Sequence, residues 1–227
     1  MIALIGAMPE EVKIIKSKIR NLKIEKKAKV EFYLGEYEGK NIVLMLSRPG
    51  KVNASMATAI LLNNYKIDYV INIGSCGSLN DKLEIGDMII GEEVRYFDVD
   101  ATEFGYEFGQ VPTCPEKYVS DKMLVKKARQ IKLDNNKIYS GLIGTSDSFI
   151  SNPKLKKDIL KKFPNMLVVE MEAAAIAQVC YNFETKFIIC RSVSDKAEEG
   201  TRITFDKFLE IAAINSSKLT TELIKNL

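Results

Sequence analysis

Carboxylate side chains follow several apolar stretches of this 227-residue sequence. Glu170 and Glu172 flank a methionine in VVEMEAAAIAQ, and Asp195 ends the apolar stretch FIICRSVSD. Glu11 comes shortly after IALIG. Ligands bind at the carboxyl ends of strands in open α/β sheets, and a charge buried there must be paired or must serve a ligand. Such groups are suited to moving protons and to stabilising a developing positive charge.

Histidine is absent from the sequence. Its absence excludes Ser-His-Asp and Cys-His arrangements and removes the usual zinc ligands and the usual general base at neutral pH. If the chain is an enzyme, we therefore expect carboxylates to move its protons. For each carboxylate the alternative is helix capping, because side-chain oxygens at a helix start accept hydrogen bonds from unpaired amides.

A further strand end carries the small-residue turn NIGSCGS, whose backbone amides are able to approach a ligand closely. The recurrence of polar or glycine-rich signals at four strand ends favours a ligand site over unrelated caps and turns. The phosphate-binding patterns GxGxxG and GxxxxGK[ST] are both missing, which weakens a dinucleotide or nucleoside triphosphate interpretation.

Short β-rich runs alternate with helical patterns along the chain. This alternation predicts a three-layer α/β fold, in which a central mixed, twisted sheet is flanked by helices. Nothing resembles a linker, so residues 1–227 are expected to form one domain. The predicted strands are IALIG, NIVLML, YVINIG, MIIGEEVRYF, KIYSGLIG, MLVVEM and FIICRSVSD. The predicted helices cover residues 9–20, 52–65, 152–163, the stretch after MLVVEM, and 205–226.

Composition narrows the class of protein and its location. The net charge of +3 argues against nucleic-acid binding, and the basic run over residues 13–29 is typical of a solvated helix face and hairpin. No stretch approaches the ~20 apolar residues of a membrane helix, and the N-terminus lacks the basic region of a signal peptide. The four cysteines show no CxxC spacing, which favours reduced thiols. We therefore expect a cytoplasmic protein that does not bind membranes.

Several longer motifs occur in order over essentially the whole chain: IGAMPEE, SRPGKVNAS, NIGSCGS, VRYFDVDATEFGYEFGQVPTCP, VVEMEAAAIA, RSVSDKA and TFDKF. In these motifs the sequence resembles the bacterial 5′-methylthioadenosine/S-adenosylhomocysteine nucleosidases. The resemblance implies a nucleoside phosphorylase-like fold, a homodimer, and hydrolysis of the bond between adenine N9 and ribose without metal or cofactor. It also implies activity on 5′-deoxyadenosine and a place in methionine salvage and in recycling the by-products of S-adenosylmethionine.

The resemblance assigns roles to the carboxylates. Glu11 matches the general base that orients the attacking water, and Asp195 matches the acid that hydrogen-bonds adenine at N7 and its amino group. Glu172 matches the residue that binds the ribose hydroxyls, while Glu170 either assists those contacts or supports the turn.

Other substrate contacts follow from the same resemblance. Those expected around adenine, the ribose and the 5′ end are Phe149, Ile150, Ser75, Gly77, Val169, Met171, Met8, Ser194 and Phe205. The long segment over residues 98–117 is expected to reach the neighbouring subunit's site with Phe104, Tyr106 and Pro112. The alternative for these three residues is packing within their own loop.

The sequence also departs from the family pattern. Arg48 and Pro49 stand in a turn that is commonly Ser-Gly-apolar-Gly and that lies near the 5′ substituent, and Phe97 replaces a common histidine. The related purine nucleoside phosphorylases hold phosphate with arginines, and one of their arginine positions is Asn72 here; Arg48 is a possible replacement. An aminofutalosine hydrolase is a second alternative. A regulatory nucleotide-binding module would explain the sheet but would not need carboxylates at three strand ends.

Overall fold

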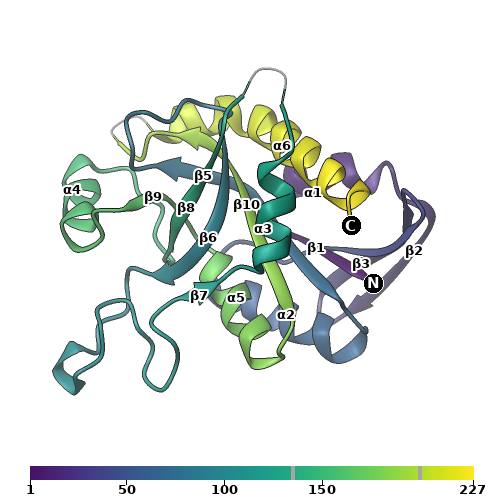
Figure 1. The fold of residues 1–227 in the computed structure, drawn as a ribbon, viewed down its shortest axis with the longest axis horizontal. Coiled ribbons are helices and arrows are strands. Elements are labelled where there is room, and N and C mark those ends of the chain that lie inside the picture. The colour runs from purple at the N-terminus through teal and green to yellow at the C-terminus, as the bar shows by residue number, and fades with distance from the viewer. Residues whose placement is uncertain (134–135, 199–200) are drawn as a thin grey trace.

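The computed structural model describes residues 1–133, 136–198 and 201–227, and a ten-stranded mixed sheet runs through its centre (Figure 1). The strand order is β10-β6-β8-β9-β5-β1-β4-β3-β2, and β7 pairs with β6. The strands are β1 (Ile2–Gly6), β2 (Arg20–Lys27), β3 (Val30–Tyr37), β4 (Lys40–Leu46), β5 (Tyr69–Ser78), β6 (Met88–Tyr96), β7 (Tyr118–Val119), β8 (Ile138–Thr145), β9 (Met166–Glu170) and β10 (Lys186–Asp195).

Part of this sheet closes on itself. Strand β10 pairs in parallel with β5 and antiparallel with β6, and β6, β8, β9 and β5 are each paired with the next. The five strands therefore form a closed ring of hydrogen-bonded neighbours. β1, β4, β3 and β2 extend the sheet from β5 as an open wing.

Helices cover both faces of the sheet. Alanine and leucine side chains of α2 and α5 share one core with one face, and apolar residues of α1, α3 and α6 share a second core with the other. Helix α4 packs in a smaller cluster with β9 and Phe97. The helices are α1 (Pro9–Lys16), α2 (Lys51–Asn64), α3 (Lys122–Arg129), α4 (Pro153–Lys162), α5 (Ala173–Asn182) and α6 (Thr201–Lys225). The predicted three-layer α/β fold is confirmed.

The apolar runs form strands because their side chains are buried on both faces. β1 is buried at every position, and β10 is buried from Phe187 to Asp195. Near-continuous apolar sequence is what parallel strands covered by helices require. Strand β2 lies at the free edge of the open wing, and its mostly exposed, lysine-rich sequence disfavours pairing with other chains.

The prediction of one helix over residues 9–20 was wrong at its C-terminal end. Helix α1 stops at Lys16. The amides of Lys18 and Ile19 donate to carbonyls only three residues before them, at Ile15 and Lys16, and β2 begins at Arg20. Helix α3 was missed, although Asp121 caps it by accepting bonds from the amides of Met123 and Leu124. Its short apolar face was hidden among the four basic residues of KMLVKKAR.

The long segment between β6 and β7 contains one short 3-10 helix, η1 (Thr102–Phe104). In Figure 1 it extends away from the body of the molecule, on the side where α5 and α2 lie. Across the described parts of the chain, no helix combines the length and apolar character needed to cross a membrane.

Candidate active site

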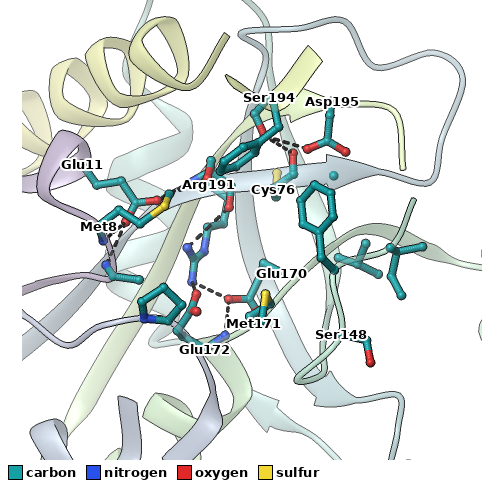
Figure 2. A pocket seen from close by; sticks show the side chains of 18 residues that line it. Met8, Glu11, Cys76, Ser148, Glu170, Met171, Glu172, Arg191, Ser194 and Asp195 are labelled. Atoms are coloured by element: carbon teal, nitrogen blue, oxygen red, sulfur yellow. Dashed lines mark hydrogen bonds and ion pairs between the residues drawn. The ribbon is translucent and has the colours of Figure 1, made fainter. Parts of the chain in front are cut away.

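A pocket lies where β5, β9 and β10 end and where the turns after β1 and β8 approach them (Figure 2). The structure brings thirteen of the predicted site residues to this pocket: Met8, Glu11, Ser75, Gly77, Phe149, Ile150, Val169, Glu170, Met171, Glu172, Ser194, Asp195 and Phe205. Pro49 also lines the pocket, and the sequence had placed its turn near the 5′ substituent. Four further lining residues were not expected there: Ala7, Cys76, Ser148 and Arg191.

Glu11 is almost fully buried in the first turn of α1. Its Oε2 accepts bonds from the amides of Ala7 (2.8 Å) and Met8 (3.1 Å), and its Oε1 accepts bonds from the amide (3.1 Å) and hydroxyl (3.3 Å) of Ser75. Gly74 makes this approach possible, because a Cβ there would lie 2.8 Å from Glu11 Oε1. The carboxylate is thus fixed as a hydrogen-bond acceptor at the pocket wall.

Arg191 is the buried cation that joins the acidic residues. Its Nη2 lies 2.9 Å from Asn72 Oδ1 and 3.3 Å from Glu172 Oε2, and it also forms an ion pair with Glu170. Burial alone lowers the pKa of Arg191, but the charges of Glu170, Glu172 and Glu11 outweigh it and raise the pKa overall. The sequence did contain a signal for this role, because Arg191 interrupts an apolar strand, and a buried arginine needs an acidic partner.

Glu170 serves the turn from β9 into α5. Its Oε2 accepts bonds from the amides of Glu172 and Ala173, both 2.8 Å long, and its Oε1 accepts a bond from the Thr145 hydroxyl. These are the contacts of a residue that supports the turn, which is one of the two roles expected for it. Because Arg191 and two amides saturate Oε2, Glu170 has little capacity left for a ligand.

Glu172 lies beside this turn with a freer carboxylate. The amide of Gly50 donates to its Oε1 at 2.9 Å, and Arg191 approaches its Oε2. Burial raises the pKa of Glu172 to about 7; Arg191 and the Gly50 amide oppose this shift, and the charges of Glu170 and Glu11 add to it. The group can therefore accept hydrogen bonds from hydroxyls and responds to pH near neutrality.

Asp195 closes β10 at the other side of the pocket. Its Oδ2 accepts a bond from the Ser194 hydroxyl (2.9 Å) and its Oδ1 accepts one from the Ala197 amide (3.0 Å). Burial raises the pKa of Asp195, although both hydrogen bonds oppose the shift. Gly77 leaves room for the carboxyl, because a Cβ there would lie 2.8 Å from Oδ1. A buried carboxyl with a raised pKa is suited to donating a proton.

Aromatic side chains line the pocket next to Asp195. The rings of Phe149 and Phe205 meet edge to face, with centroids 5.5 Å apart. Phe149 remains 44% exposed, so part of its side chain is accessible to a ligand, while Ile150 beside it is buried. Figure 2 shows Glu11 and Asp195 at opposite sides of the pocket, with Arg191 between them and Glu172 below.

Three predicted residues lie outside the pocket of their own chain. Phe104 is 82% exposed in η1, and Tyr106 and Pro112 belong to the same extended segment. Their predicted site is that of a neighbouring subunit, so this assignment stays a prediction. Arg48 also lies outside: it is exposed, its Nη2 is 3.5 Å from the Lys29 carbonyl, and Pro49 forms the pocket wall instead.

Comparisons with known proteins agree with this architecture. A model of the phosphorylase superfamily matches residues 1–225. The 5′-methylthioadenosine/S-adenosylhomocysteine nucleosidase of Bacillus subtilis is 45% identical over 100% of this chain and 99% of its own.

Solved structures of the same kind are also similar. The nucleosidase of Neisseria meningitidis, in complex with methylthio-immucillin-A, has a TM-score of 0.98 and 43% identity, covering 100% of this chain and 99% of that one. The nucleosidase of Colwellia psychrerythraea, in complex with adenine, has a TM-score of 0.98 and 41% identity, covering 100% and 95%. The chain therefore belongs to the phosphorylase superfamily and, within it, to the 5′-methylthioadenosine/S-adenosylhomocysteine nucleosidases.

Proposed function

We propose that this protein hydrolyses the N-glycosidic bond of 5′-methylthioadenosine and S-adenosylhomocysteine, releasing adenine and the corresponding thioribose, and that it also acts on 5′-deoxyadenosine. The observation that carries the proposal is that one pocket holds a carboxyl group suited to donating a proton and, at its opposite side, a carboxylate suited to accepting one. Asp195 has the raised pKa of a proton donor, and Glu11, at the opposite side, is fixed as an acceptor.

The chemistry follows from where charge develops. When the bond between N9 and C1′ breaks, its electron pair goes to adenine and positive charge develops on the sugar. Asp195 supplies a proton at N7, so that adenine leaves as a neutral base. Glu11 accepts a proton from the water whose oxygen bonds to C1′. Glu172 accepts hydrogen bonds from the ribose hydroxyls, and its negative charge favours the cationic sugar.

The positions and partners of the arginines in and near the pocket support hydrolysis over phosphorolysis. Arg191 is the one arginine among the described residues that line the pocket, and its guanidinium is already engaged by Asn72, Glu170 and Glu172. The position where related phosphorylases carry an arginine is Asn72, and Arg48 points its guanidinium to the Lys29 carbonyl. A phosphate dianion would meet the buried carboxylates of Glu11, Glu170 and Glu172 here, without a free cation among the described lining residues.

The sugar product tests the proposal. We expect purified protein incubated with 5′-methylthioadenosine to form free methylthioribose at a rate that does not depend on added phosphate. The product is identified by mass spectrometry with and without phosphate. Formation of the 1-phosphate, or a strict phosphate requirement, would replace the hydrolase assignment with that of a phosphorylase.

We also propose that the active form is a homodimer. Phe104 and Val52 are 82% and 77% exposed, and Tyr181 is 56% exposed. They belong to η1, α2 and α5, which lie along one side of the molecule with the extended segment (Figure 1). Exposed apolar groups gathered in this way are typical of an interface. Phe104, Tyr106 and Pro112 would then cover the alkylthio group in the partner's pocket.

Sedimentation velocity tests this assembly. We expect a dimer at micromolar concentration, because the apolar side chains of this surface need a partner. A monomer with full activity would show that each pocket is complete without a second subunit.

The proposed substrates place the protein in methionine salvage and in the disposal of by-products of S-adenosylmethionine. We propose a cytoplasmic location. The four cysteines are free thiols, which suits a reducing compartment.

A further inference from the structure

The start of α2 is held by carboxylates from other parts of the chain. The helix has no acidic residue in its own first turn. Instead, the Gly50 amide donates to Glu172 Oε1 at 2.9 Å, and the Lys51 amide donates to Asp147 Oδ1 at 2.8 Å. Two neighbouring amides thus bind two acids from different segments, where the helix dipole strengthens both bonds.

The Lys51 side chain connects a third segment, which contains Asp98, to the start of α2. Its Nζ lies 2.7 Å from Asp98 Oδ2 and 3.7 Å from Asp147 Oδ2. The amide of Asp147 donates to Asp98 Oδ2 at 3.2 Å, so each of the three residues contacts the other two. Asp98 follows β6, and Asp147 follows β8. We call Lys51, Asp98 and Asp147 the rim cluster.

The rim cluster lies outside the pocket but next to two of its walls. Pro49 and Gly50 precede Lys51 directly, and Ser148, Phe149 and Ile150 follow Asp147 directly. Pro49 and the residues from Ser148 to Ile150 line the pocket, whereas the rim cluster itself does not. Gly50 has a φ of 96°, and a Cβ on it would lie 3.2 Å from Asp147 Oδ1, so the backbone passes close to this carboxylate.

We propose that Lys51, Asp98 and Asp147 are positioning residues of the active site: they hold the Gly50 amide against Glu172 and fix the Pro49 wall relative to the Phe149 wall. The proposal rests on the proposed function, since it assigns these residues a part in binding the ribose and the base. Nothing in the chemistry requires the rim cluster to touch the substrate.

The charges around Glu172 give this role a measurable signature. The carboxylate faces Arg191 and the Gly50 amide, which lower its pKa, and Glu170 and Glu11, which raise it. Loss of the Gly50 hydrogen bond removes one of the two lowering influences. The pKa of Glu172 then rises above about 7, and its ionised form, which accepts bonds from the ribose hydroxyls, is reached only at higher pH.

Folding stability is a weaker readout of the rim cluster. Asp147 is 52% exposed at its side chain, and Lys51 and Asp98 are 22% and 29% exposed. Partly exposed ion pairs contribute little to the stability of a fold. A substitution here should therefore change binding and its pH dependence without unfolding the protein.

Two substitutions at one position separate geometry from charge. Asp147→Ala removes the acceptor for the Lys51 amide, whereas Asp147→Asn keeps an acceptor oxygen and removes only the charge. The matched control is Asp158→Asn, since Asp158 is 47% exposed and pairs with Lys161 on α4. The Michaelis constant for 5′-methylthioadenosine is measured for each variant at a series of pH values.

For Asp147→Ala we expect the Michaelis constant to rise about tenfold at neutral pH and its pH dependence to move upward by about one unit, as loss of one charge-assisted hydrogen bond predicts. Asp147→Asn should recover most of this loss, and Asp158→Asn should match the unmodified protein. A normal Michaelis constant and pH profile in Asp147→Ala would overturn the positioning role.

Hydrogen exchange supplies a readout that needs no turnover. In Asp147→Ala we expect the amides of Gly50 and Lys51 to exchange faster than in the unmodified protein and in Asp158→Asn. Unchanged exchange would also overturn the proposal. If the unmodified protein fails to cleave nucleosides, the proposed function is wrong, and exchange at these two amides still decides whether the rim cluster holds the start of α2.

Discussion

Replacing Glu11 by glutamine is expected to lower the turnover rate on 5′-methylthioadenosine by roughly 10²–10⁴, the range for a lost general base. Both oxygens of Glu11 accept bonds from N–H donors, at Ala7 and Met8 on one side and at Ser75 on the other. The amide nitrogen of glutamine would face one of these donors in either orientation. We therefore also expect a loss of about 1–3 kcal/mol in the free energy of unfolding.

The neighbouring residue provides the control. Glu10 lies in the same helical turn but is exposed, so Glu10→Gln should keep both turnover and stability. Steady-state rates and thermal unfolding of the two variants are compared under the same conditions. If Glu11→Gln lost stability but kept near-normal turnover, Glu11 would be a cap of α1 and not the base that activates water.

Replacing Asp195 by asparagine is expected to lower the turnover rate by a similar factor, roughly 10²–10⁴, for a different reason. The amide of asparagine still donates a hydrogen bond to N7, but it cannot pass on a proton. The fold should persist, because the asparagine oxygen can accept the Ala197 amide and Ser194 can turn its hydroxyl proton fully to the Cys76 carbonyl, which lies 3.2 Å away. Circular dichroism checks the fold, and the rate of adenine release checks the chemistry.

The pH profile separates this acid from a merely structural carboxyl. In the unmodified protein, turnover should fall as pH rises through the raised pKa of Asp195, because the proton to be donated is lost. Asp195→Asn should lack this alkaline limb. Asp87→Asn is the matched control: Asp87 is also buried and accepts backbone amides of Glu84 and Lys137, but it does not line the pocket. Normal turnover in Asp195→Asn would make Asp195 only a cap for Ala197.

Apolar patterning was sufficient to predict the central strands and the covering helices. IALIG and YVINIG are almost wholly apolar, and FIICRSVSD begins with four apolar residues, because these strands lie buried between two helical layers. The residues at their ends were predictable for the same reason. A polar group at the end of a buried strand, or shortly after it, is expected at the rim of the sheet, and Glu11, Glu172 and Asp195 do line one pocket there.

The remaining features depend on partners that local sequence does not reveal. Arg191 interrupts an apolar strand, and its meaning becomes clear only when β9 and α1 bring carboxylates to it. Lys51, Asp98 and Asp147 are separated by nearly fifty residues each. The pairing of β6 with β8 brings Asp98 and Asp147 together, and the start of α2 adds Lys51. A hairpin was predicted within the basic run over residues 13–29, but the bounds of β2 were not, because its exposed lysine-rich sequence carries no strong alternation. Strand β3, which is mostly buried or half-buried, was not predicted.

The closed ring of strands has a consequence for how the nascent chain acquires its activity. β10 is the last of the described strands in sequence, yet it joins β5 to β6. On β10, Arg191 contacts Ser75, although the two residues are 116 positions apart in the sequence. Contacts between such distant residues slow folding, and a ribosome-bound chain that ends before β10 exposes two unpaired strand edges. Arg191 and Asp195 are both on β10. The pocket can therefore form only after β10 has been synthesised, and translation products that stop before β10 should be aggregation-prone as well as inactive.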